Sequence, residues 1–116
     1  MLQDFVRLPS GRLKCYGFPK PPVPGTDTII PLMTSEELVK EGREQRNCVR
    51  LYARLVAAGE ICIYRVLAPE RATLSIVPAG DGSWRRRELR AAANADVSDE
   101  TRATVDQWLE SYNVFR

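Results

Sequence analysis

The sequence predicts an α+β domain in which an antiparallel three-stranded meander packs against two to three helices. Three observations support this class. Apolar residues recur at helical spacing in two segments, near residues 34–58 and 98–112. Three β-rich runs lie between them, and their short connections favour antiparallel pairing. The length, 116 residues, suits one hydrophobic core, so we expect a single domain over 1–116 with helices on one face of the sheet.

Residues 1–30 are rich in proline and glycine. Strand-like runs on either side of the Ser10-Gly11 turn predict a short hairpin that could extend the meander. The stretch from Gly17 to Gly25 holds four prolines, which lack the backbone donor that a helix or a central strand needs. We expect it to form an extended tether across the core of residues 31–116. Binding of this stretch in a partner's groove is the alternative.

The first helical segment is predicted to begin at Thr34 and to continue to about Ala58, with a break or bend near residues 42–46. Thr34, with Glu37 three residues later, forms a capping box, and Gly59 is typical of the position after a helix. In the second half of the segment, the apolar spacing predicts a stripe facing the core, made by Cys48, Leu51, Tyr52, Leu55 and Val56.

Three strands are predicted next, at residues 60–67, 72–77 and 84–90. Alternation in the third strand would place Trp84, Arg86, Glu88 and Arg90 on one face. A solvent-facing tryptophan beside two arginines could stack on bases and contact phosphates. Nucleic-acid binding through Trp84, Arg86 and Arg90 is therefore one hypothesis, and a solvated strand face is the other.

The last helix is predicted from Asp99 to Tyr112. Ser98 is its expected N-cap, and the acidic residues of its first turn suit the helix dipole. The apolar stripe of this helix consists of Val105, Trp108, Leu109 and Tyr112. Asn94 lies in the preceding loop, where an asparagine is more typical of a brace or cap than of a ligand contact.

Composition excludes several classes of site. The chain has no histidine, which removes Ser-His-Asp and Cys-His catalysis and histidine-ligated zinc. Its three cysteines include no C-x-x-C pair, so we expect neither a disulfide framework nor a metal or other cofactor. The net charge is 17 minus 15, or +2, which does not by itself indicate a nucleic-acid partner.

The apolar runs are too short to cross a bilayer, and the first residues lack the order of a signal peptide. We therefore expect a cytoplasmic protein that has no membrane partner.

The stretch EGREQRNCVRLY, from Glu41 to Tyr52, brings a thiol, an amide and a phenol together. Free cysteines in apolar stripes are usually core residues, and this is what we expect of Cys48. The alternative is a nucleophile, with Tyr52 and Asn94 as positioning groups. That role needs an accessible sulfur and a lowered thiol pKa, and without histidine only Tyr52, Glu44 or water could act as its base.

This stretch resembles the signature of the PcfJ-like proteins of conjugative plasmids and phages: Glu-Gly, a few residues, His or Asn before Cys-Val, and then Tyr. The resemblance covers roughly residues 29–110. It continues in order through residues 31–38 (PLMTSEEL), Gly59 before a strand, Thr73, and Asn94 before a helix. It implies a common fold and a shared polar cluster of Asn47, Cys48, Tyr52, Thr73 and Asn94. Asn47 stands where the family often has histidine.

The family context implies a non-catalytic interaction domain of a mobile genetic element. Such a small chain could act as an inhibitor that binds a host protein or a nucleoprotein defence complex through its sheet face and N-terminal segment. An enzyme with Cys48 as nucleophile, acting on an acyl or phosphoryl substrate, and a nucleic-acid-binding module are the two alternatives.

Overall fold

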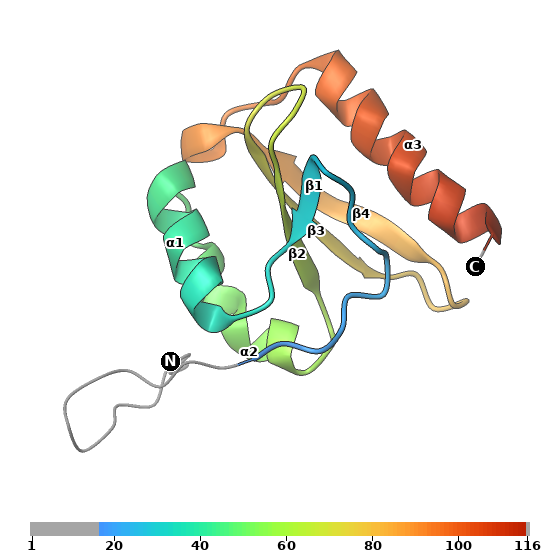
Figure 1. Ribbon diagram of the computed structural model, residues 1–116, viewed down its shortest axis with the longest axis horizontal. Coiled ribbons are helices and arrows are strands. Elements are labelled where there is room, and N and C mark those ends of the chain that lie inside the picture. The colour runs from blue at the N-terminus through green and yellow to red at the C-terminus, as the bar shows by residue number, and fades with distance from the viewer. Residues whose placement is uncertain (1–16, 116) are drawn as a thin grey trace.

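The computed structural model describes residues 17–115 and confirms the α+β class (Figure 1). The predicted hairpin around the Ser10-Gly11 turn lies outside the described residues. The elements in chain order are strand β1 (Ile29–Pro31), helix α1 (Ser35–Gln45), 3₁₀ helix η1 (Val49–Tyr52), helix α2 (Ala53–Ala57), strands β2 (Cys62–Val66), β3 (Ala72–Pro78) and β4 (Trp84–Arg90), 3₁₀ turn η2 (Ala92–Asn94) and helix α3 (Asp99–Phe115).

The sheet is antiparallel in the order β1-β2-β3-β4, so it contains the predicted meander and one further strand. The added strand, β1, pairs with β2 and places Ile29 opposite Val66. Three residues that end in a proline show too little alternation to be recognised as a strand, which is why the sequence does not predict β1.

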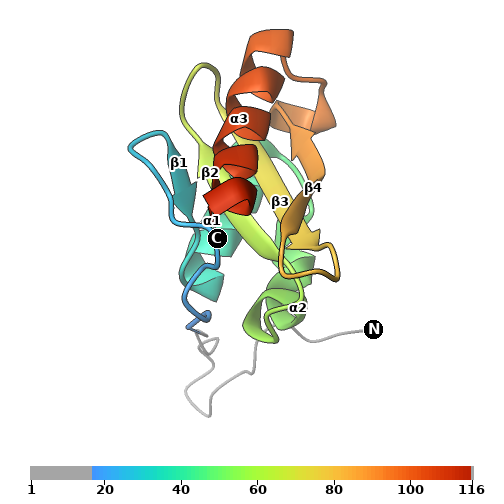
Figure 2. The same cartoon turned by 90° about the vertical axis from the view of Figure 1, so that its right-hand side faces the viewer.

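Helices cover both faces of the sheet, which corrects the expectation of helices on one face (Figures 1 and 2). Helix α3 covers one face, and α1 and α2 cover the other. The physical reason lies in β2, where Ile63 is buried on one face of the sheet and Tyr64 and Val66 are buried on the other. The core under α3 contains Tyr64, Val66, Leu74, Ile76, Leu89, Val105 and Leu109. The core under α1 and α2 contains Phe18, Leu32, Leu38, Ala53, Val56, Ile61 and Ile63.

The predicted caps are present. The Thr34 hydroxyl accepts from the backbone N–H of Glu37 at 3.1 Å, and the Glu37 carboxylate accepts from the N–H of Met33 at 2.6 Å. Gly59 (φ 76°) follows α2, and its N–H donates to the Val56 carbonyl at 3.0 Å. At the last helix, the Ser98 hydroxyl accepts from the N–H of Thr101 at 3.1 Å. Local signals therefore place these helix ends correctly.

The proline-rich stretch from Gly17 to Gly25 contains no helix and is held against the domain. The Tyr64 hydroxyl donates to the Val23 carbonyl at 2.6 Å, and the Trp108 indole N–H donates to the Pro24 carbonyl at 3.0 Å. The two rings meet edge to face, with their centroids 5.0 Å apart. One aromatic pair thus joins the tether, the sheet and α3.

Candidate functional site

Cys48 is exposed, so the expectation that it is a core residue is wrong. Helix α1 ends at Arg46, whose φ of 52° is left-handed, and the chain resumes at Val49 as a 3₁₀ helix. The predicted apolar stripe assumes a continuous α-helix with 3.6 residues per turn. The break and the tighter 3₁₀ turn point these side chains in other directions. As a result Leu51 and Leu55 are also exposed, and Val56 is the buried member of the predicted stripe.

Cys48 borders a polar cavity of about 200 Å³. The structure brings together here all the members of the polar cluster that the resemblance implies. The lining residues are Asn47, Cys48, Val49, Tyr52, Thr73, Ser75, Glu88, Arg90 and Asn94. They come from two separate parts of the sequence: the α1–η1 corner with η1, and β3, β4 and η2.

The floor of the cavity is made by two directly opposed pairs across β3 and β4. Thr73 is opposite Arg90, and Ser75 is opposite Glu88. Elsewhere this face of the sheet carries the apolar core under α1 and α2. The fold therefore places four polar residues where a packed sheet face would ordinarily be apolar.

A buried carboxylate organises the wall of the cavity. The Glu41 side chain is 1% exposed. It accepts from Arg71 Nη1 at 2.9 Å and from the Thr73 hydroxyl at 2.6 Å. The Thr73 hydroxyl in turn accepts from Asn47 Nδ2 at 3.3 Å. The hydrogen bond to Glu41 raises the pKa of the Arg71 guanidinium above its ordinary value.

The contacts of this wall explain why Glu41, Gly42 and Asn47 occur at this spacing in the stretch EGREQRNCVRLY. Asn47 Oδ1 accepts from the backbone N–H of Val49 at 3.1 Å, which fixes the start of η1 beside Cys48. The Asn47 N–H donates to the Gly42 carbonyl at 3.0 Å. A Cβ on Gly42 would lie 3.2 Å from the Asn47 carbonyl oxygen, so glycine allows this close return of the chain. Glu41, Gly42 and Asn47 together hold Cys48 at the cavity.

The rim combines aromatic and charged groups. The Arg87 guanidinium lies 5.1 Å from the centroid of the Tyr52 ring, a cation–π distance. Arg90 Nη1 lies 2.6 Å from Asp96 Oδ1. Asn94 has a left-handed backbone (φ 61°), which asparagine tolerates better than most residues. Its position therefore fits a loop brace as well as a group that faces a ligand.

Ser75 is the residue that sequence reasoning missed. Its side chain is buried at the cavity, with the residue 5% exposed, yet its hydroxyl has no hydrogen-bond partner within residues 17–115. Such an unpaired group costs a fold about 1–3 kcal/mol. The sequence contains one sign of this: Ser75 lies two residues after Thr73, so the two side chains share one face of the strand.

Trp84, Arg86, Glu88 and Arg90 do not share one face, which corrects the prediction from alternation. Ser75 is opposite Glu88 and Ile76 is opposite Arg86, so a β-bulge leaves Arg87 unpaired and reverses the alternation. Arg86 Nε lies 2.8 Å from Asp106 Oδ1 of α3, and Trp84 packs against the core under α3. Glu88 and Arg90 lie instead on the cavity side.

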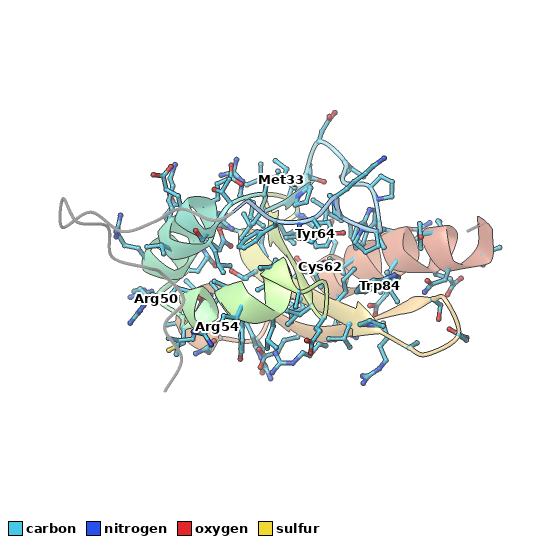
Figure 3. All side chains as sticks on the ribbon, turned by 90° about the horizontal axis from the view of Figure 1, so that it is seen from below. Met33, Arg50, Arg54, Cys62, Tyr64 and Trp84 are labelled. Carbon is cyan, nitrogen blue, oxygen red and sulfur yellow. The ribbon has the colours of Figure 1, made fainter. Side chains whose placement is uncertain are left out.

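The other described thiol is in a different environment. Cys62 packs against the core under α3, and burial raises the pKa of its thiol to about 11. Figure 3 shows Cys62 and Tyr64 toward the centre of the molecule and Arg50 of η1 and Arg54 of α2 at the outside. The part of the chain that the structure describes contains no group of three or more acidic, cysteine or histidine side chains that could hold a metal ion.

No helix among residues 17–115 is both long enough and apolar enough to cross a membrane. No protein-family model matches the sequence, and neither a curated protein nor a solved structure matches it. The PcfJ-like assignment therefore stays a prediction that is based on the motif residues.

Proposed function

We propose that this protein is a non-catalytic interaction domain that recognises its partner at the polar cavity over β3 and β4. One observation carries the proposal: the residues that the resemblance groups together converge on a cavity whose buried Ser75 hydroxyl has no partner within the described residues. A polar group that is buried without a hydrogen bond weakens a fold, so its presence at an open cavity favours a role in binding.

The PcfJ-like resemblance supports the identity of the partner. It favours a plasmid or phage origin, and with it a host protein or a nucleoprotein defence complex as the target. The described part of the N-terminal segment packs on its own domain through Val23 and Pro24. This contact favours the cavity, rather than the proline-rich stretch, as the place of recognition.

Filling the mouth of the cavity should abolish partner capture. Cys48→Phe adds a large ring at an exposed position beside the cavity, and tagged protein should then capture at least about tenfold less partner from a host-cell lysate, the equivalent of about 1.4 kcal/mol. Leu51→Phe is the matched control, because Leu51 is 48% exposed in the 3₁₀ helix that begins directly after Cys48 and does not line the cavity. The proposal fails if Cys48→Phe captures the partner as well as Leu51→Phe does.

An enzyme is the second candidate, because the exposed thiol of Cys48 shares the cavity with Tyr52 and Asn94. Glu44, one of the bases considered from the sequence, pairs instead with Lys40 and Arg71 on α1's outer side. Glu88 is the carboxylate that lines the cavity. In this alternative the Cys48 sulfur bonds to an acyl or phosphoryl group while the bond from that group to its leaving group breaks, and the thiol proton passes to the leaving group. Tyr52 and Asn94 position the substrate.

A further inference from the structure

The geometry points to a neutral primary carboxamide, carried by an asparagine or glutamine side chain of the partner, as the group that enters the polar cavity. This inference rests on the proposed function and names the chemistry that the same site selects. It follows from the arrangement of donors and acceptors, from the charges that are already paired, and from the size of the cavity.

The floor of the cavity presents an acceptor and a donor side by side. Glu88 and Arg90 are two residues apart on one face of β4, which places their Cα atoms about 7 Å apart. Ser75 is opposite Glu88, and its unpaired hydroxyl can donate or accept. A carboxamide has one acceptor oxygen and an NH₂ group with two donors, so it can use all three groups at once.

The charges at the cavity already have counter-charges. Arg90 lies 2.6 Å from Asp96, and Arg87 Nη1 lies 3.6 Å from Glu88 Oε1. The remaining polar lining consists of hydroxyls, amides and the Cys48 thiol. A carboxylate or an ammonium group would lose its hydration here without meeting an uncompensated opposite charge, and that loss disfavours a charged group.

Size sets a further limit. At about 30 Å³ for each water in the liquid, a cavity of about 200 Å³ holds the equivalent of six or seven waters. One side chain of asparagine or glutamine size fits this space. An apolar side chain of the same size would leave the Ser75 hydroxyl without a partner.

The test uses four small probes with three carbons each: propionamide, propionate, n-propylammonium and the zwitterion β-alanine. Each is titrated into ¹⁵N-labelled full-length protein, and the backbone amide shifts of Cys48, Ser75 and Glu88 are followed. We expect propionamide to bind about tenfold more tightly than each of the three charged probes. A difference of this size is what one unmade hydrogen bond costs in binding. Equal or tighter binding of any charged probe, or no shift with propionamide, overturns the inference.

Ser75→Ala is the variant for this test, and Ser111→Ala, at an exposed position on α3, is its control. Propionamide affinity should fall about tenfold in Ser75→Ala and stay unchanged in Ser111→Ala. The outcomes separate the two proposals. If Cys48→Phe abolishes partner capture but propionamide does not bind, the cavity is the binding site and the carboxamide assignment is wrong. If Cys48→Phe leaves partner capture intact, the proposed function itself is wrong.

Discussion

Replacing Glu41 with glutamine should lower the free energy of unfolding by about 3 kcal/mol. This is the cost of removing one charge of a buried ion pair while the other charge remains. The Glu41 side chain is 1% exposed and accepts from both Arg71 and Thr73. The neutral amide cannot compensate the Arg71 charge, and its NH₂ group would face donors. The Arg71 side chain is 29% exposed, so water solvates part of its guanidinium. For this reason we expect a stability loss at the lower end of the range for buried pairs.

Glu44→Gln is the matched control for this change. Glu44 lies on the same helix and contacts the same Arg71 at 3.2 Å, but its side chain is 42% exposed. Its loss should cost no more than about 0.5 kcal/mol, as is usual for exposed pairs. Urea unfolding of both variants measures the difference. Equal losses would show that Glu41 is not the buried centre of the wall that holds Asn47 and Cys48.

Iodoacetamide should modify Cys48 at least about a hundredfold faster than Cys62 near pH 8. The thiolate is the reacting form, and burial raises the pKa of Cys62 from 9.0 to about 11, which lowers its thiolate population by about two orders of magnitude. Cys48 is exposed at the cavity. A Cys15→Ser background and mass spectrometry of the labelled peptides give the two rates. The same protein in urea provides the control, because the two rates should then become similar.

This measurement also bears on the choice between binding and catalysis. Slow labelling of Cys48 in the native protein would contradict an open cavity and would remove the enzyme hypothesis with it. If Cys48 labels rapidly, Cys48→Ala separates the two roles. Partner capture should survive this small substitution in an interaction domain, whereas an enzyme that uses the thiol as nucleophile would lose its activity completely.

Much of the fold follows from signals within a few residues. Thr34 with Glu37, Gly59, and Ser98 mark helix ends by hydrogen bonds that those residues make locally. The three longer strands follow from β-rich runs between turns. The two-faced helix coverage does not follow, because which side of the sheet a helix occupies depends on packing between distant segments.

The site was predictable in part. The motif resemblance groups Asn47, Cys48 and Tyr52 with distant residues, and the structure shows these side chains around one cavity. The exposure of Cys48 was not predictable, because it depends on the left-handed Arg46 that ends α1. The orientation of Glu88 and Arg90 was not predictable either, since one bulged residue reverses strand alternation without a recognisable signal.

The most direct test is the change in the free energy of unfolding when the Ser75 hydroxyl is removed. We hold that this hydroxyl serves a ligand and not the fold, because it is buried at the cavity with no partner among the described residues. Urea unfolding of Ser75→Ala should therefore show a stability at least equal to that of the unmodified protein and up to about 3 kcal/mol higher. A loss of more than about 1 kcal/mol would contradict this account, because it would show that the hydroxyl already has a structural partner.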